Sequence, residues 1–253
     1  RKEMPMVKIN ADDGYYFGLQ VFATIAVEDN IPVFPMEHLE RLQNALKNLH
    51  IQNPETESAL TVSRLRKEAF LCPYRHGVLK ISVSEQNLLF TVRENTYREE
   101  QYRRGFAVQT SPIRRNETSP LVYYKTANYG DNILEKRRAH SCGFDEPVFL
   151  NTRGQICEGA TSNIFFVKNQ TLFTPKVSCG LLNGIMRNYL MKKYPVEEAV
   201  LYPGQISEFD EIFLTNSLLG IMPVSSWDGH PIRSCSFSQN LRREYLSLCR
   251  TLL

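Results

Sequence analysis

Four separated segments of the 253-residue sequence carry side chains that could do chemistry together. They are centred on a guanidinium (Arg41), an amine (Lys125), a carboxylate (Glu158) and a glycine at a predicted helix start (Gly184). An amine acts as a nucleophile or base when its pKa is lowered, and the first turn of a helix can bind an anion. Taken alone, each feature has an ordinary explanation as a solvated charge, a turn carboxylate or a polar helix face. A site therefore requires elements that bring the four segments together.

The composition is that of an ordinary folded protein. Hydrophobic residues make up 42% and charged residues 23% of the chain, which excludes a disordered, collagen-like or coiled-coil polypeptide. The net charge of +3 is too small and too evenly spread to indicate nucleic-acid binding. The length fits one large domain or two smaller ones. We therefore expect a small molecule as the partner, with no nucleic acid.

The cysteines, the apolar runs and the histidines argue against further classes of protein: disulfide-rich, membrane-spanning, secreted and metal-binding. The 6 cysteines contain no CxxC pair, so we expect them to be reduced and mostly packed. No apolar run approaches the roughly 18 residues of a membrane span, and residues 1–5 show no signal-peptide core. We therefore expect a cytoplasmic protein that does not enter a membrane. No metal is expected either, because metal-ligand spacing is missing among His38, His50, His76, His140 and His230.

The N-terminal half predicts a small lobe of helices and strands. Leucines recur at helical spacing over residues 35–50 and indicate an amphipathic helix with Arg41 off its apolar stripe. Residues 77–83 and 87–92 predict two strands around a short polar turn. A further strand is predicted over residues 106–110.

A linker is predicted between this lobe and the rest of the chain. Residues 111–120 are polar, flanked by prolines, and break both the helix and the strand periodicity. We therefore expect a small N-terminal α+β domain over residues 1–114 and a larger domain over residues 115–253.

The larger domain begins with a predicted helix and a predicted hairpin. Residues 128–139 indicate a helix that ends near Gly143, where a glycine cap is expected. Residues 163–168 and 171–174 predict two strands joined by the two-residue connection Asn169-Gln170.

Two further elements would carry polar groups into a site. Asn183 predicts the N-cap of a helix that extends to about residue 194. Residues 211–214 predict a strand, and Thr215, Asn216 and Ser217 a loop that offers hydroxyl and backbone N–H groups. Strands and helices without regular βαβ alternation indicate the α+β class.

Taken in order, these segments resemble the class IV aminotransferase and lyase family, the fold type IV enzymes that use pyridoxal phosphate. The resemblance covers most of the chain and depends on the joint order and spacing of its motifs. It implies a two-domain α+β fold, pyridoxal 5'-phosphate in the cleft between the domains, and a homodimer. The motifs are His38-Leu39-Glu40-Arg41-Leu42, Lys125-Thr126-Ala127-Asn128-Tyr129, Glu158-Gly159-Ala160-Thr161-Ser162-Asn163-Ile164-Phe165, Leu182-Asn183-Gly184-Ile185-Met186-Arg187, and Thr215-Asn216-Ser217 with Pro223-Val224.

The resemblance also implies a role for each of these positions. Lys125 would form a Schiff base with the cofactor, and Glu158 would hold the pyridine nitrogen protonated, which makes the ring an electron sink. Tyr129 would lie near the phenolic oxygen of the ring, and Asn163 would assist. The remaining positions would hold the phosphate through a guanidinium, a hydroxyl and a helix N-terminus: Arg41, Ile185, Met186, Thr215 and Asn216.

Two of these motifs favour one reaction within the family. Residues 215–224 and 183–187 are more similar to the aminodeoxychorismate lyase pattern than to the transaminase pattern. This implies release of 4-aminobenzoate and pyruvate from 4-amino-4-deoxychorismate, with Lys125 as the catalytic base. Thr24 is expected beside the substrate and Lys80 near a carboxylate, although a β-branched strand residue and a solvated lysine would explain them equally well.

Two alternatives stay open. Residues 17–23 and 84–87, which would shape the substrate pocket, depart from the glycine, acidic and arginine pattern common in the family. The first alternative is therefore a branched-chain or D-amino acid aminotransferase of the same family. The second is a non-catalytic binding scaffold, since a fold does not fix a function, although the presence of Lys125 and Glu158 argues against it.

Overall fold

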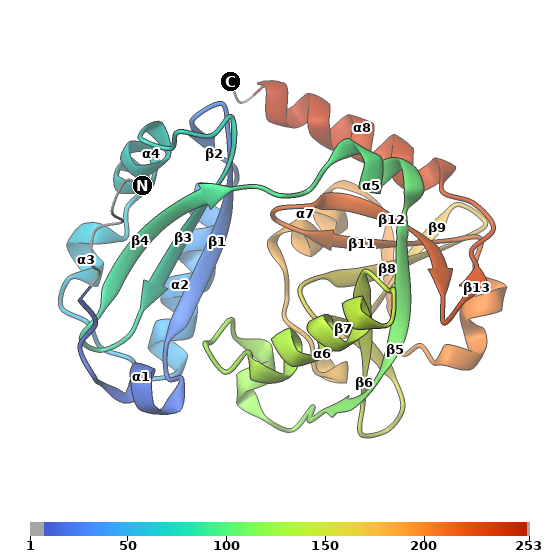
Figure 1. The fold of residues 1–253 in the computed structure, drawn as a ribbon, viewed down its shortest axis with the longest axis horizontal. Helices are drawn as coiled ribbons and strands as arrows, with labels where there is room; N and C mark the ends of the chain where they lie inside the picture. Colours follow the sequence, from blue (N-terminus) through green and yellow to red (C-terminus); the bar gives the residue numbers. More distant parts are fainter. Residues whose placement is uncertain (1–7, 252–253) are drawn as a thin grey trace.

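The computed structural model describes residues 8–251, which form a small and a large lobe side by side (Figure 1). Residues 1–5, in which no signal-peptide core is predicted, lie outside the described residues. The small lobe comes first along the chain and consists of α1 (Asp13–Phe17), β1 (Val21–Glu28), β2 (Ile31–Pro32), α2 (Pro35–Asn48), α3 (Thr56–Ala59), α4 (Val62–Phe70), β3 (His76–Val83) and β4 (Leu88–Glu94).

The small lobe is an antiparallel sheet with one apolar and one polar face. Its strands lie in the order β2-β1-β3-β4. Successive side chains of a strand point to opposite faces, so alternate residues of β1, β3 and β4 pack in the core against α2 and α4. The other alternate residues include Thr24 and Lys80, which are cross-strand partners. The polar face therefore remains available to line a cavity.

Helix α2 follows the predicted amphipathic pattern. Pro35 occupies its first turn, where the missing N–H costs nothing. Leu39, Leu42 and Leu46 are buried against the sheet, and burial of each such side chain stabilises the fold by roughly 1.5–3 kcal/mol. Arg41 lies off this stripe and is only partly buried. The prediction for this helix is confirmed.

The large lobe is built on a nine-stranded sheet. Eight strands follow the order β10-β9-β8-β11-β12-β5-β6-β7, and β13 pairs with β12. The elements are α5 (Glu99–Arg104), β5 (Phe106–Arg115), η1 (Pro120–Tyr123), α6 (Gly130–Ser141), β6 (Glu146–Asn151), β7 (Ile156–Gly159), β8 (Asn163–Lys168), β9 (Thr171–Pro175), η2 (Val177–Cys179), α7 (Ile185–Lys193), β10 (Val196–Ala199), η3 (Pro203–Glu208), β11 (Glu211–Asn216), β12 (Gly220–Trp227), β13 (His230–Pro231) and α8 (Ser236–Thr251).

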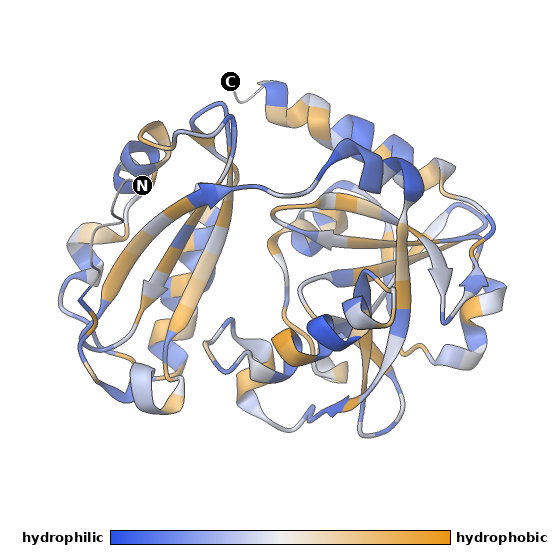
Figure 2. Cartoon of the chain, in the orientation of Figure 1, coloured by the Kyte–Doolittle hydropathy of each residue, from blue (hydrophilic) through white to orange (hydrophobic). Residues whose placement is uncertain are grey.

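Helix α8 covers part of this sheet. It contacts β12 and β11, and it buries Leu241, Tyr245 and Cys249 among residues of β8, β11 and α7. In Figure 2 the helix carries both hydrophilic and hydrophobic residues, as expected for a helix with one face on a core. The mixed helices and strands of both lobes confirm the α+β class.

The predicted linker at residues 111–120 is wrong over its first half. Strand β5 continues to Arg115 and pairs in parallel with β6 at Arg114 and Arg115. Pro112 falls where the register with β6 shifts, so its missing N–H is tolerated there. A division between residues 114 and 115 would cut this strand. We propose instead that the lobes divide at residues 95–98, which connect β4 to α5.

Most local predictions in the large lobe are confirmed. Helix α6 ends at Ser141, followed by Gly143 with a positive φ of 84°. The β8–β9 hairpin turns through Asn169 and Gln170, both with positive φ, as a two-residue hairpin connection requires.

Two local predictions are wrong. The N-cap of α7 is Gly184, not Asn183, and it makes no side-chain cap bond, because the Asn183 carboxamide oxygen accepts a hydrogen bond from Arg187 instead. Thr215 and Asn216 end strand β11 rather than lying in a loop, because both pair with β12 and Thr215 also pairs with β8. The second correction places strand backbone at Thr215 and Asn216, where a polar loop was expected.

The lobes join where the chain of the large lobe returns to β1. The Phe22 backbone N–H donates to the Lys125 carbonyl at 2.9 Å, and the Ala127 N–H donates to the Gln20 carbonyl at 2.7 Å. Residues around Lys125 thus extend the edge of the small sheet. This places the predicted reactive lysine between the two lobes.

Three further features bear on the class of protein. Within residues 8–251, no helix combines the length and apolar character needed to cross a membrane. Across the same residues, no three His, Cys, Asp or Glu side chains are grouped as metal ligands. All 6 cysteines lie in the described part of the chain and are unpaired there.

Candidate active site

A cavity of about 440 Å³ lies between the lobes and collects most of the predicted site residues. Met186 and Lys80 are not among its lining residues; Met186 is 1% exposed in the core, and Lys80 lies on the polar face of the small sheet. The predicted residues that line the cavity are Thr24, Arg41, Lys125, Tyr129, Glu158, Asn163, Ile185, Thr215 and Asn216.

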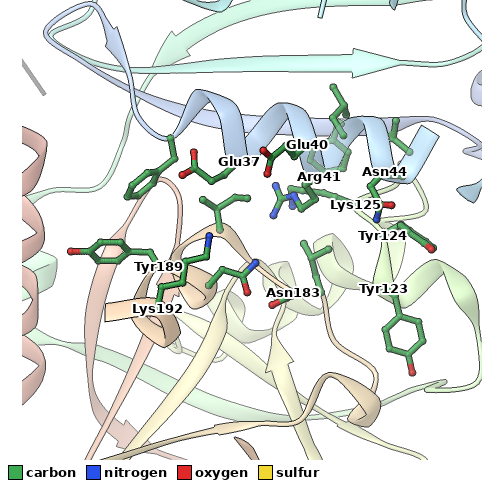
Figure 3. Close-up of a pocket in the computed structure, with 18 residues that line it drawn as sticks. Glu37, Glu40, Arg41, Asn44, Tyr123, Tyr124, Lys125, Asn183, Tyr189 and Lys192 are labelled. Atoms are coloured by element: carbon green, nitrogen blue, oxygen red, sulfur yellow. The ribbon is translucent and has the colours of Figure 1, made fainter. Parts of the chain in front are cut away.

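A second cavity, of about 380 Å³, lies beside Arg41 and Lys125 (Figure 3). Its walls are α2, with Glu37 and Glu40, and α7, with Tyr189 and Lys192. The two cavities share Arg41 and Lys125. Of these two cavities, Glu158 and Thr215 line the first and not the second, so the predicted chemical groups converge in the first.

The Lys125 side chain lies among aromatic rings. Its Nζ is 4.5 Å from the centroid of the Phe22 ring and 4.7 Å from that of Tyr129. The same Nζ donates to the Tyr129 hydroxyl at 3.3 Å. The ring of Phe22 meets that of Tyr129 edge to face. This packing holds the amine in place and removes water from around it.

Desolvation lowers the pKa of Lys125 to about 7. The positive charges of Arg41 and Lys80 contribute to this lowered pKa, and the Glu158 carboxylate opposes them. A substantial fraction of the amine is therefore unprotonated near neutral pH, as a nucleophilic or basic lysine requires.

Glu158 lies on β7, buried at the floor of the same cavity. Its carboxylate accepts from Arg115 at 3.3 Å and from the Leu182 backbone N–H at 3.1 Å. Burial raises the pKa of Glu158 to about 7, although Arg115 and the Leu182 bond act to lower it. A carboxyl group balanced in this way can hold a proton on a ring nitrogen placed against it.

Other residues that line the cavity present donors without partners. Arg41 has a pKa lowered by burial to about 10, and no carboxylate among residues 8–251 forms an ion pair with it. The Thr215 Oγ1 is buried with no hydrogen-bond partner in the described residues. Helix α7 starts here with the N–H groups of Ile185 and Met186 in its first turn. A phosphate would satisfy all of these groups, so the residues present fit pyridoxal phosphate.

Two predicted cofactor residues use their side chains to fix the backbone. Asn163 donates to the Leu182 carbonyl at 2.8 Å, and a Cβ at Gly184 would collide with its Oδ1. Asn216 donates to the Thr161 carbonyl and accepts from the N–H groups of Leu218 and Leu219. They shape the cavity, and direct contact with the cofactor stays a prediction for both.

Sequence reasoning missed several residues of the site. Arg115 was placed in the linker, yet it is the cation paired with Glu158. Phe22, whose ring lies beside the Lys125 amine, was given no role. A buried carboxylate needs a cation, but nothing in the sequence indicates which of many arginines supplies it. His38 is also unexpected, because it is 1% exposed inside α2 rather than on the surface.

A cleft with an activated lysine, a facing carboxyl group and an anion site defines an enzyme built around a phosphorylated carbonyl cofactor. The model of the class IV amino-transferase family matches residues 20–227, so the chain belongs to that family, whose members depend on pyridoxal phosphate. The predicted family and cofactor are confirmed.

Relatives with two kinds of name are similar to the chain. The aminodeoxychorismate lyase of Bacillus subtilis is 26% identical over 236 residues, which are 85% of this chain and 79% of the relative. A candidate branched-chain-amino-acid aminotransferase of Methanocaldococcus jannaschii is 28% identical over 242 residues, 88% of this chain and 83% of the relative. A solved structure of a candidate 4-amino-4-deoxychorismate lyase from Legionella pneumophila superposes with a TM-score of 0.85, at 26% identity and 96% coverage of both chains. The chain is thus an enzyme of this family, with lyase and transaminase names both among its relatives.

Proposed function

We propose that the protein is a pyridoxal-phosphate-dependent lyase that converts 4-amino-4-deoxychorismate into 4-aminobenzoate and pyruvate. This reaction would supply a precursor for folate synthesis. The observation that carries this proposal is a polar group of residues, Thr24, Arg93, Asn95 and Thr96, that line the same cavity as Lys125. A wall of this kind suits an acidic ring better than the apolar side chain of a branched-chain amino acid.

The cofactor supplies one piece of chemistry when bound: its protonated ring accepts the electron pair left when a C–H bond of the substrate breaks. Glu158 holds the proton on the ring nitrogen, with Arg115 keeping this buried carboxyl group from losing its charge altogether. Arg41, Thr215 and the first turn of α7 hold the phosphate.

Lys125 moves the protons in this proposal. As an unprotonated amine it removes the proton from the ring carbon that bears the substrate amine. Loss of the enolpyruvyl ether then makes the ring aromatic, and Lys125 returns its proton to the departing enolpyruvate, which becomes pyruvate. Atoms balance without water or an amino acceptor, so no keto acid is required.

The requirement for a keto acid decides between lyase and transaminase. Purified protein loaded with pyridoxal phosphate is given 4-amino-4-deoxychorismate alone, and in parallel amino acids with 2-oxoglutarate. The proposal expects 4-aminobenzoate and pyruvate in equal amounts from the first mixture. Turnover only in the second would refute it and establish the branched-chain or D-amino acid aminotransferase alternative, which the Methanocaldococcus relative supports.

The scaffold alternative is tested by colour. A catalytic protein binds pyridoxal phosphate through Lys125, absorbs visible light, and loses that absorbance on borohydride reduction. A colourless protein that ignores added cofactor would support a binding scaffold.

We also propose a homodimer. Tyr15, Tyr16 and Phe17 of α1 are 67%, 64% and 65% exposed, an aromatic surface suited to burial against a second copy. Light scattering after gel filtration should give twice the chain mass, and the monomer mass would contradict this proposal.

A further inference from the structure

Asn132 is a buried residue in the first turn of α6, and both ends of its carboxamide are hydrogen-bonded. Its Oδ1 accepts from the Arg115 Nη1 at 3.0 Å. Its Nδ2 donates to the Ala160 carbonyl at 2.6 Å. Because only the nitrogen end of a carboxamide can donate, the bond to Ala160 fixes which way round the amide lies. The oxygen end is therefore directed at Arg115, the cation that pairs with Glu158.

The Arg115 guanidinium is held from three directions. Its Nη2 donates to the Glu158 carboxylate at 3.3 Å, and its Nη1 donates to Asn132. The centroid of the Phe149 ring lies 4.0 Å from its Cζ. Within residues 8–251 its Nε has no hydrogen-bond partner, so Asn132 is the only polar contact of this guanidinium besides Glu158. The loss of Asn132 would free one side of a cation that is only 12% exposed.

Asn132 lies outside the cavity in which the cofactor is expected. Neither Asn132 nor Arg115 is among the described residues that line the cavity of about 440 Å³. Both line a separate cavity of about 260 Å³, and Glu158 lines both cavities. Glu158 therefore lies between the cofactor cavity and the two groups that support its carboxylate. Any influence of Asn132 on the cofactor would pass through Glu158.

The amide at position 132 is neutral, which leaves the charge of Arg115 to Glu158. Burial raises the pKa of Glu158 to about 7, and Arg115 has the largest effect among the groups that lower it. A carboxylate in place of Asn132 would compete with Glu158 for the guanidinium. An amide orients the guanidinium without this competition.

The other titratable groups around Glu158 do not replace Arg115. The charge of Lys125 also lowers the pKa of Glu158, with a smaller effect, and the charge of Glu146 raises it. Burial raises the pKa of the remaining two groups, which are therefore uncharged near neutral pH: Tyr129 and Cys157.

We infer that Asn132 is a positioning residue, which holds Arg115 against Glu158 and thereby keeps this carboxyl group charged. A charged carboxylate leaves the proton on the ring nitrogen of the cofactor, and the protonated ring is the better electron sink. This consequence rests on the role of Glu158 in the proposed function. It is the same for a lyase and for a transaminase.

The pKa of Glu158 in the full chain without cofactor tests the inference. Carbon NMR of protein that carries isotope-labelled glutamate follows the carboxyl groups against pH, and Glu158→Gln identifies the signal of Glu158. Asn132→Leu removes both hydrogen bonds at nearly constant size and should raise this pKa by about one, because a cation within hydrogen-bond reach lowers a carboxyl pKa by about 1–3. Asn132→Asp adds a negative charge beside Arg115 and should raise it further. An unchanged pKa in both variants would overturn the inference.

A double substitution separates positioning from general packing. Arg115→Gln alone should raise the pKa of Glu158. Asn132→Leu added to Arg115→Gln should raise it no further, because Asn132 acts through Arg115. Effects that add in the double variant would give Asn132 a packing role and overturn the inference.

A matched control removes a buried carboxamide elsewhere. Asn53 is 8% exposed and donates to the Ser84 carbonyl at 2.8 Å in the small lobe. Asn53→Leu should leave the pKa of Glu158 unchanged. A rise equal to that of Asn132→Leu would show a general effect of lost packing and overturn the inference.

The cofactor-loaded protein gives an independent readout. Nitrogen NMR of isotope-labelled pyridoxal phosphate distinguishes a protonated from an unprotonated ring, and Asn132→Leu should lower the protonated fraction. In turnover assays the same variant should lower kcat about tenfold with little change in KM. A ring that stays protonated in Glu158→Gln would refute the role of Glu158 in the proposed function. Together with a raised pKa of Glu158 in Asn132→Leu, that result would still support the inference.

Discussion

The two walls of the active-site cavity are built differently. The large-lobe wall is buried and held by neighbouring groups: Glu158 is 8% exposed and bonded to Arg115 and Leu182, and Thr215 is fully buried. The small-lobe wall carries Thr24 and the exposed Arg93, and Arg93 forms no ion pair with a carboxylate among the described residues. The cofactor end is thus preorganised, whereas the substrate end leaves its charges to be satisfied by a ligand. Substitutions on the two walls should therefore fail in different ways.

The largest effect is expected at the junction of the walls, where Lys125→Ala removes the amine. Activity should fall by at least about a thousandfold, because both proton transfers are lost. Visible absorbance of the cofactor should disappear on gel filtration. Lys192→Ala, which removes a lysine from the other cavity, is the control and should keep both. Retained colour in Lys125→Ala would show that another group holds the cofactor.

Glu158→Gln tests the large-lobe wall. The amide keeps the size but cannot hold a proton on the ring nitrogen, so kcat should fall about 100-fold while KM changes little. The absorbance spectrum of the bound cofactor should shift at the same time. A rise in KM with unchanged kcat would contradict the division between the walls, because it would give Glu158 a substrate-binding role.

The pH dependence of cofactor binding tests the pKa of Lys125, which charges from both lobes influence. Only the unprotonated amine reacts, and its pKa is about 7. The rate at which the apoprotein captures pyridoxal phosphate should therefore rise with pH and level off above about 7, being roughly tenfold slower one unit below that pKa. Lys80 lowers the pKa of Lys125, so Lys80→Gln should move the profile to higher pH. An unchanged pH profile would show that the charge of Lys80 does not influence the pKa of Lys125.

Thr215→Val on the large-lobe wall is expected to lower cofactor affinity while raising the stability of the apoprotein. The hydroxyl is buried without a partner in the described residues, so valine should stabilise the apoprotein by about 1 kcal/mol. Cofactor affinity should drop about tenfold, since one phosphate donor is lost. Thermal denaturation and cofactor titration measure the two changes. A less stable apoprotein would mean that the hydroxyl has a structural partner.

Thr24→Val on the small-lobe wall should have the smallest effect. A neutral hydroxyl contributes one modest hydrogen bond, so KM should rise about threefold with kcat and cofactor affinity unchanged. Steady-state kinetics beside Thr91→Val, which lies on the same sheet face but on the other side of Lys80, give the comparison. A large fall in kcat would place Thr24 in the chemistry.

Local sequence signals predicted the elements that depend on local contacts. The spacing of Leu39, Leu42 and Leu46 indicated α2, and Asn169-Gln170 indicated the β8–β9 turn. The length of β5 escaped prediction because its polar C-terminal half is stabilised by parallel pairing with β6, about 35 residues later in the chain. Asn183 failed as a cap because its side chain bonds Arg187.

Site residues that belong to a family motif could be predicted from the sequence. Site residues that act through a partner elsewhere in the chain could not. Arg41, Lys125, Glu158 and Thr215 were found from their motifs and do line one cavity. Arg115 acts on Glu158 from 43 residues away. Arg93 reaches the cavity only because β4 pairs with β3 in one particular register. Such partnerships depend on the tertiary fold, which the sequence patterns do not contain.

The reactive lysine belongs to the large lobe by chain order, yet its backbone is bonded to β1 of the small lobe. Any hinge movement at residues 95–98 that separates the lobes would carry the Lys125 amine along with the small sheet and leave Glu158 behind. The distance between the Lys125 amine and the Glu158 carboxyl group would then increase as the lobes move apart.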